Sequence, residues 1–137
     1  MANEAKKKIL VVDDEPQIRK LLRARLEYHN YKVIEGEDGE EALKLLREEK
    51  PDLLILDVGM PKMDGYEVCR RIRKEEGISL TPIIVLTARS AGNDKIDSID
   101  AGANTFIVKP FDPELLIFKV KGFFGAGIIR KHGQQKL

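Results

Sequence analysis

Four short unbroken apolar runs lie along the chain, at residues 9–12, 53–56, 83–86 and 106–108, and a shorter segment at 32–34 is apolar after Lys32. Strands that are covered on both faces have such continuous runs, whereas strands with one solvated face alternate apolar and polar residues. We therefore predict five buried strands, with the short second one near an edge of the sheet.

Between these runs, apolar residues recur at the three- and four-residue spacing of an amphipathic helix. The first expected helix follows Pro16, and the second spans about residues 40–49. The third follows Asp64 and Gly65, and the fourth ends at Gly102 as a C-cap. The fifth begins near Pro113, with Asp112 as a candidate N-cap. The residues expected on inward helix faces are Ile18, Leu21, Leu22 and Leu26; Ala42, Leu45 and Leu46; Val68, Cys69 and Ile72; and Leu115, Leu116, Val120 and Phe123.

Strands that alternate with helices must run parallel, with right-handed crossovers. The expected fold is a doubly wound α/β sandwich of the flavodoxin-like, three-layer kind, with five helices around a five-stranded parallel sheet of order 2-1-3-4-5. We expect a flexible N-terminus at residues 1–8, one domain at 9–124 and a C-terminal tail at 125–137. The tail either is disordered or extends the fifth helix. Gly122, Gly125 and Gly127 weaken helix continuation by ~1 kcal/mol each.

The composition is that of a soluble globular protein, with 42% hydrophobic and 34% charged residues. A single cysteine, Cys69, excludes an internal disulfide and fits a reducing cytoplasm, where we expect the protein. No apolar run approaches the ~20 residues that cross a membrane, and the N-terminus is too polar for a secretory signal. The first 114 residues carry a net charge of −4 and the remainder is basic, which does not indicate direct nucleic-acid binding.

Polar side chains follow four of the predicted strands directly: Asp13 and Asp14, Asp57, Thr87 and Lys109. Open α/β sheets bind ligands beyond the carboxyl ends of their strands, where the strand order reverses. The first and third strands are neighbours in the expected order, so their three carboxylates converge and repel one another unless a cation or protons neutralise them. Hard oxygen ligands favour Mg²⁺, and a lysine opposite suits a second anion such as a phosphoryl group.

Each of these residues also has a simpler structural interpretation. The acidic pair before Pro16 could cap a helix, and Asp57 could be a turn residue. Thr87 could bond a nearby backbone group, and Lys109 could be a solvated charge. Their convergence on one edge of the sheet favours a binding site over these separate explanations.

Four segments carry a resemblance to a known family: VVDDEP, LLILDVGMPKMDGYEVCRRIR, PIIVLTA and GANTFIVKPF. They resemble the motifs of response-regulator receiver domains of two-component signalling, from about Ile9 to about Lys121. The resemblance implies a phosphoprotein switch that takes its phosphoryl group from a sensor histidine kinase, a phosphotransfer protein or a small phosphodonor. It also implies that the chain catalyses only its own phosphorylation and dephosphorylation.

The family pattern implies a role for each matching residue. Asp57 matches the phosphoacceptor, which forms an aspartyl phosphate. Asp13, Asp14 and Asp57, with the backbone carbonyl of Gly59, match the ligands of Mg²⁺. Gly59 and Arg89 also occupy two positions that tune the lifetime of the phosphoryl group; Gly59 leaves one side open to water, whereas Arg89 could shield or pair with the phosphate.

The remaining matches concern phosphoryl binding and switching. Lys109, Thr87 and the Ala88 amide match the groups that bind the phosphoryl group. Thr87 and Phe106 match a switch pair whose aromatic side chain turns inward on activation. Pro110 would follow a cis peptide bond, which X-Pro sequences allow at low cost.

The fifth helix departs most from the family pattern. Ile117, Phe118 and Phe124 are expected on faces that are usually polar. Exposed contiguous apolar area usually marks an interaction site. We therefore expect the surface of helix four, strand five and helix five to bind an unknown output protein or a second copy of the domain, although stray apolar residues in a frayed tail are an alternative.

Three other classes of protein fit the sequence less well. A phosphohydrolase of the haloacid-dehalogenase type would need a second aspartate where this chain has Gly59. A flavodoxin-like cofactor binder would need a Gly/Ser/Thr-rich loop after the first strand, where this chain has an acidic run. A scaffold of the same shape that takes no phosphate would not need the complete set of site residues.

Overall fold

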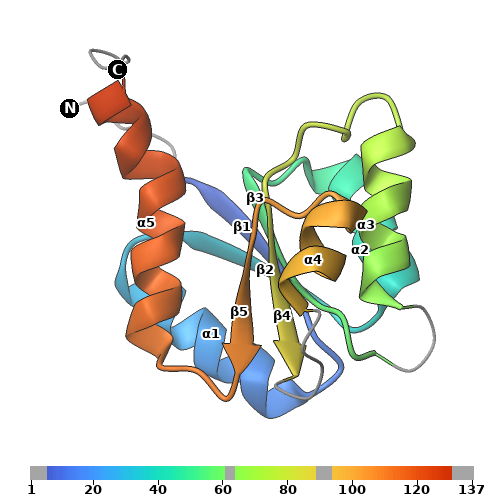
Figure 1. The fold of residues 1–137 in the computed structure, drawn as a ribbon. Helices are drawn as coiled ribbons and strands as arrows, with labels where there is room; N and C mark the ends of the chain where they lie inside the picture. Colours follow the sequence, from blue (N-terminus) through green and yellow to red (C-terminus); the bar gives the residue numbers. More distant parts are fainter. Residues whose placement is uncertain (1–5, 61–63, 89–93, 131–137) are drawn as a thin grey trace.

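Five parallel strands form the sheet of the computed structural model, which describes residues 6–60, 64–88 and 94–130 (Figure 1). The strands are β1 (Lys8–Val12), β2 (Lys32–Gly36), β3 (Leu53–Asp57), β4 (Ile83–Ala88) and β5 (Thr105–Lys109). Their order is β2-β1-β3-β4-β5, which confirms the prediction and the edge position of β2. The strand order therefore reverses between β1 and β3, where a ligand site is expected in such sheets.

The strands are continuously apolar because successive side chains enter two separate cores. Leu10 and Val12 of β1 pack on one face of the sheet, whereas Ile9 and Val11 pack on the other. Figure 1 shows α2 (Gly39–Glu49), α3 (Gly65–Lys74) and α4 (Asp94–Ala101) on the first face. The helices α1 (Pro16–Tyr28) and α5 (Pro113–Arg130) cover the second face. This arrangement leaves the ends of the strands as the places where polar side chains can gather.

Local polar contacts set several helix ends as the sequence predicts. The Asp112 carboxylate accepts a hydrogen bond of 2.9 Å from the backbone N–H of Glu114, which confirms the predicted cap of α5. Gly102 follows α4 with a φ of 106°, a conformation that favours glycine, and its N–H donates to the carbonyl of Ile99. The Lys109–Pro110 peptide is cis, as expected.

Three predicted helix faces need correction. Leu21 of α1 is exposed rather than buried. In α2, Leu43 is buried although it was not expected on the inward face, whereas Leu45, which was expected there, is only half-buried. In α5, Ile117 is only 2% exposed although it was expected on an outward face, and Leu115 is 45% exposed although it was expected on the inward face. Two apolar stripes about 100° apart overlap in this helix, and the sheet surface selects the one that contains Ile117.

The fifth helix continues to Arg130, well past the predicted end of the domain. Gly122 and Gly125 lie within it, and a Cβ at either position would meet nothing within 4 Å. The domain boundaries themselves stay a prediction, because residues 1–5 and 131–137 fall outside the described part of the chain. Across the described ranges, no helix combines the length and the apolar character that a bilayer span requires.

Candidate functional site

The carboxyl ends of β1 and β3 bring the three predicted aspartates together. Asp13 and Asp14 follow β1, and Asp57 is the last residue of β3. One carboxylate oxygen from each lies within 4.8 Å of the others. Asp13 and Asp57 are buried and Asp14 is exposed, so the cluster opens toward solvent on one side. Such a cluster attracts a cation and holds its own charges at a cost in free energy.

Lys109, at the end of β5, lies against this cluster. Its Nζ is 3.0 Å from Oδ2 of Asp13, 3.5 Å from Oδ2 of Asp57 and 3.5 Å from Oε1 of Glu15. Burial lowers the pKa of the ammonium, but the hydrogen bond to Asp13 and the neighbouring carboxylates outweigh burial and raise it overall. Lys109 therefore stays charged at neutral pH and compensates part of the acidic charge. Glu15 was not assigned a role from the sequence, although it belongs to the same acidic run.

Asp57 is held in place by the residue two positions further along. The backbone N–H of Gly59 donates to Oδ1 of Asp57 at 3.0 Å. Burial raises the pKa of Asp57 and the Asp13 charge acts in the same direction, whereas Gly59 and Lys109 act against them. A Cβ at position 59 would lie 3.6 Å from Oδ1, so this position borders the carboxylate directly. The pKa of Asp57 is raised overall, as expected for a carboxylate that is poorly solvated.

Gly65 is a residue whose importance the sequence did not reveal. It begins α3, and a Cβ there would lie 2.5 Å from Cα of Val58 and 2.7 Å from the carbonyl oxygen of Asp57. Its N–H donates to the Val58 carbonyl at 3.4 Å. The start of α3 thus packs directly on the backbone of the Asp57 segment, which only a glycine permits. The Asp64-Gly65 pair in the sequence signalled a helix start and nothing more.

Thr87, Ala88 and Phe106 lie on the two strands beyond Asp57. Thr87 is buried, and its hydroxyl donates to the carbonyl of Ala88 at 3.4 Å. Ala88 pairs with Lys109 in the β4–β5 register, so both strands end beside the carboxylates. Phe106 is half-buried and packs against the core beneath α2, α3 and α4. Their switch roles stay predictions, and Arg89 lies outside the described residues.

The donor set fits a hard divalent cation. Three carboxylate oxygens converge, two of them from buried residues, and carboxylate oxygens are the ligands that Mg²⁺ prefers. Mg²⁺ keeps several of its waters, and the exposed side of Asp14 leaves room for them. The residues present could therefore hold Mg²⁺, with Asp13, Asp14 and Asp57 as the carboxylate ligands.

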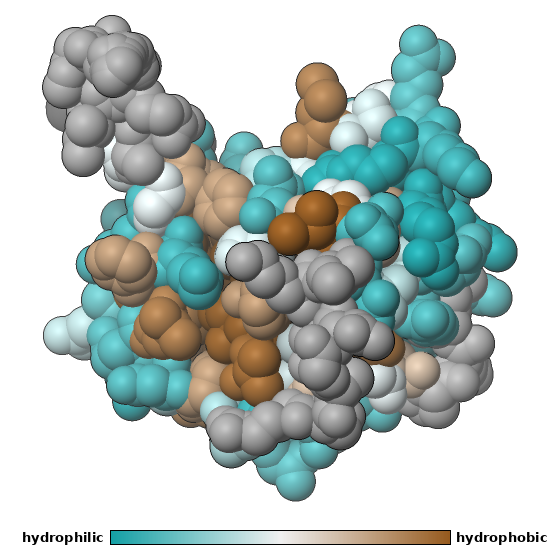
Figure 2. All heavy atoms as spheres, viewed as in Figure 1, coloured by the Kyte–Doolittle hydropathy of each residue, from teal (hydrophilic) through white to brown (hydrophobic). Residues whose placement is uncertain are grey.

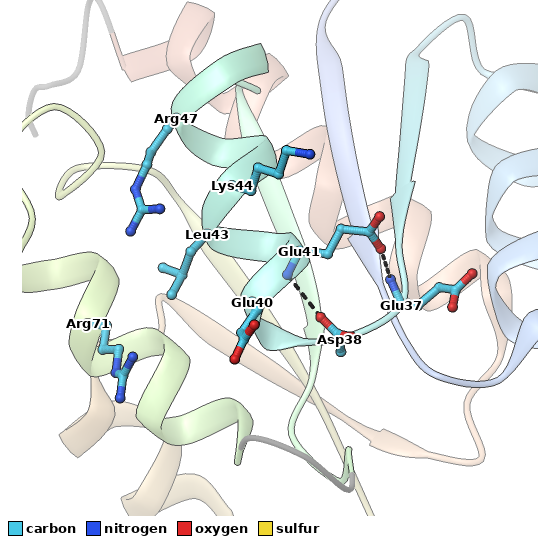
Figure 3. A pocket seen from close by; sticks show the side chains of 8 residues that line it. All are labelled: Glu37, Asp38, Glu40, Glu41, Leu43, Lys44, Arg47 and Arg71. Atoms are coloured by element: carbon cyan, nitrogen blue, oxygen red, sulfur yellow. Dashed lines mark hydrogen bonds between the residues drawn. The ribbon is translucent and has the colours of Figure 1, made fainter.

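A second concavity, between α2 and α3, has a structural explanation. It is lined by Glu37, Asp38, Glu40, Glu41, Leu43, Lys44, Arg47 and Arg71 (Figure 3). Asp38 accepts from the N–H of Glu41 at 2.9 Å, and the Glu41 carboxylate accepts from the N–H of Glu37 at 2.8 Å. The first bond caps the start of α2 and the second joins Glu41 to the turn before the helix, so two of the carboxylates in this concavity have structural partners. Among the predicted site residues that the structure describes, none lines this concavity.

The comparisons with known proteins agree with this geometry. A model of the response regulator receiver domain matches residues 9–121. "Probable transcriptional regulator ycf27" of Guillardia theta is 48% identical over 118 residues, which are 86% of this chain and 45% of that protein. "Alkaline phosphatase synthesis transcriptional regulatory protein PhoP" of Bacillus subtilis (strain 168) is 48% identical over 115 residues, 84% of this chain and 47% of that protein.

Among solved structures, the Vibrio cholerae chemotaxis protein CheY4 superposes with a TM-score of 0.80 at 35% identity, covering 85% of this chain and 98% of that chain. The chain spans about half the length of the curated relatives it matches. The likeness to both relatives therefore concerns the part of each that this chain covers.

Proposed function

Because the chain belongs to the family of response regulator receiver domains, which are signalling proteins of two-component systems rather than classical enzymes, we propose that it is a phosphorylation switch with Asp57 as acceptor. One observation carries this proposal: Asp57 ends a buried strand with its carboxylate among Asp13, Asp14 and Lys109. A nucleophile, an acidic metal site and a cation for the incoming phosphoryl group thus lie together.

In the proposed reaction, a carboxylate oxygen of Asp57 attacks the phosphorus of a phosphodonor. An O–P bond forms as the bond from phosphorus to the donor's leaving group breaks. Lys109 would pair with the phosphoryl oxygens, and Asp13, Asp14, Asp57 and the Gly59 carbonyl would hold Mg²⁺. Bound Mg²⁺ supplies charge neutralisation, which phosphoryl transfer needs more than covalent help from the protein.

The product provides the signal. An aspartyl phosphate adds roughly −1.5 to −2 charge, which new hydrogen bonds from Thr87, Ala88 and Lys109 can stabilise. The Thr87 hydroxyl would exchange its long bond to the Ala88 carbonyl for one to the phosphoryl group. Phe106, one strand away and half-buried, would then turn inward. The role of Thr87 would be wrong if phosphorylated Thr87→Ala showed the full wild-type change in amide NMR signals around Phe106.

The surface of α4, β5 and α5 is the proposed output face. Ile99 of α4 and Leu115 and Phe118 of α5 are exposed there, and Figure 2 shows apolar atoms gathered over α5 and β5. Response regulators interact with histidine kinases and output domains. We propose that this face, altered by the movement of Phe106, binds the output partner or a second copy of the domain. Phosphorylation would shift an existing equilibrium between its two forms.

Treatment with acetyl phosphate and Mg²⁺, followed by intact mass analysis, tests the acceptor. The wild-type chain should gain one phosphoryl group, and Asp57→Asn should gain none. Asp97→Asn, which removes an exposed carboxylate on α4, is the matched control and should react like the wild type. A full phosphoryl adduct on Asp57→Asn would show that the acceptor lies elsewhere.

A further inference from the structure

Arg19 of α1 reaches back to the acidic turn that precedes its own helix. Its Nη1 donates to the carbonyl oxygen of Asp13 at 2.6 Å, and its Nε donates to Oε1 of Glu35 at 3.0 Å. Its Nη2 also lies 3.9 Å from Oε2 of Glu37. The Arg19 side chain is only 12% exposed. The guanidinium is therefore fixed between α1, the end of β1 and the edge strand β2.

The Asp13 carbonyl belongs to the peptide unit that joins Asp13 to Asp14. A peptide unit is planar, so a bond to its oxygen restricts the backbone rotation on both sides. The Asp13 N–H donates to the carbonyl of Gly36 at 3.3 Å, and Oδ1 of Asp13 accepts from the N–H of Glu15 at 2.9 Å. With Arg19 bound to the carbonyl, the backbone of this turn is held on each side of the peptide that orients the two carboxylates.

We propose that Arg19 is a positioning residue for the Mg²⁺ site. It holds the Asp13–Asp14 peptide in the orientation that keeps both carboxylates within reach of Asp57. This inference rests on the proposed function, because it assumes that the three carboxylates bind Mg²⁺. Outer contacts of this kind commonly change metal affinity by about 10- to 100-fold when they are lost.

The direction of the change in Mg²⁺ affinity on loss of Arg19 distinguishes a positioning role from a purely electrostatic one. Arg19 is a cation near a cation site, so its charge opposes Mg²⁺ binding through space. Removal of that charge alone should tighten Mg²⁺ binding. Loss of the contact to the Asp13 carbonyl should instead weaken it, because the carboxylates would no longer be held together before the metal arrives.

Arg23 provides a matched control on the same helix. It lies one turn after Arg19 and pairs with the other oxygen of Glu35 and, at 2.8 Å, with Glu27. Its hydrogen bonds in the structure do not include Asp13. Arg23→Met therefore removes one positive charge and one partner of Glu35, as Arg19→Met does, and leaves the acidic turn untouched.

The experiment is a Mg²⁺ titration without any phosphodonor, followed by the amide NMR signals of Asp13, Asp14 and Asp57. After melting curves confirm that the variants fold, Arg19→Met should bind Mg²⁺ about 10-fold more weakly than the wild type. Arg23→Met should bind it equally or more tightly. Unchanged or tighter binding by Arg19→Met, or an equal loss in Arg23→Met, would overturn the inference.

A second variant tests the inference if Arg19→Met does not fold. Arg19→Lys keeps the charge, but one ammonium group cannot reproduce the planar fork that reaches Asp13, Glu35 and Glu37 together. It should also weaken Mg²⁺ binding, and wild-type affinity in this variant would contradict the positioning role. If the amide signals of the site in the wild-type chain did not respond to Mg²⁺, the proposed metal site itself would be wrong. Equal Mg²⁺ binding by the wild type and all variants would instead overturn only the role of Arg19.

Discussion

The ammonium group of Lys109 lies 3.0 Å from a carboxylate oxygen of Asp13, although 96 residues separate them in the sequence. Asp13 is completely buried, and its carboxylate accepts hydrogen bonds from Lys109 and from the backbone N–H of Glu15. The pair also joins the end of β5 to the end of β1, with β3 and β4 between them. Removal of one partner from a buried ion pair leaves an uncompensated charge, which destabilises the folded state more than the pair itself stabilises it.

Lys109→Ala should therefore destabilise the metal-free protein. We expect a loss of about 1–3 kcal/mol in the free energy of unfolding at pH 7, because Asp13 and Asp57 lose their shared cation. Saturating Mg²⁺ should restore part of this loss by replacing the missing charge. Urea unfolding in EDTA and in Mg²⁺ measures both effects. Lys20→Ala, at an exposed position on α1, is the control. A loss that Mg²⁺ leaves unchanged would argue against a shared electrostatic site.

Asp57→Asn should have the opposite effect on stability. The folded-state pKa of Asp57 is raised above its ordinary value of 3.8, so ionisation of this carboxyl costs more in the folded than in the unfolded chain. The penalty on the wild type therefore grows as the pH rises above 3.8 and is complete above the folded-state pKa, whereas below 3.8 the carboxyl is protonated in both states. In EDTA at pH 7 the variant should melt a few degrees higher.

The pH dependence provides the check on this argument. The difference in melting temperature between Asp57→Asn and wild type should shrink as the pH falls through the folded-state pKa and vanish below about 3.8. Asp97→Asn, on the exposed side of α4, should show no such trend. A gap that persists unchanged at low pH would mean that packing, rather than charge, causes the stabilisation.

The sequence predicted the residues of the site better than the contacts that hold them. Buried strands and the polar residues that follow them leave a strong local signal, so Asp13, Asp57 and Lys109 could be placed together from the strand order alone. The Arg19 contact depends on where a side chain of α1 ends relative to a backbone carbonyl, which no spacing encodes. The prediction of the inward face of α5 was wrong for a related reason, since two overlapping apolar stripes can be distinguished only by the surface they pack against.

Two glycines should respond to alanine in opposite directions. At Gly65 a new Cβ would collide with backbone atoms of Val58 and Asp57, so Gly65→Ala should lower the free energy of unfolding by about 1–3 kcal/mol. At Gly122, in the middle of α5, the space is open, and Gly122→Ala should raise it by about 0.5–1 kcal/mol. Urea unfolding measures both changes in the free energy of unfolding. A Gly65→Ala variant as stable as the wild type would show that α3 can move away from Asp57.

Leu21 should affect transfer from a protein donor more than transfer from a small one. It lines an apolar hollow beside the site with Ile18, Pro110 and Phe111. A partner that delivers phosphate to Asp57 would cover this hollow, whereas acetyl phosphate would not. Leu21→Lys should therefore slow phosphorylation by a cognate kinase several-fold and leave the acetyl phosphate rate unchanged. The control is Tyr28→Lys, at the far end of the same helix, and equal slowing with both donors would exclude a docking role.

The output face provides the last prediction. Phe118 is 75% exposed on α5, and Leu115 beside it on the helix is also exposed, whereas Ile117 belongs to the core. Charged residues at Leu115 and Phe118 should therefore disrupt an interface without disturbing the fold, and Ile117 should be left intact. If the domain self-associates through this face, sedimentation of the phosphorylated wild type should show dimers that Leu115→Glu with Phe118→Lys loses, while Asp57 phosphorylation continues. Leu80→Glu, an exposed apolar position between α3 and β4, should retain the dimer. Monomers in every sample would exclude self-association, and unchanged affinity for an identified output partner would exclude this face altogether.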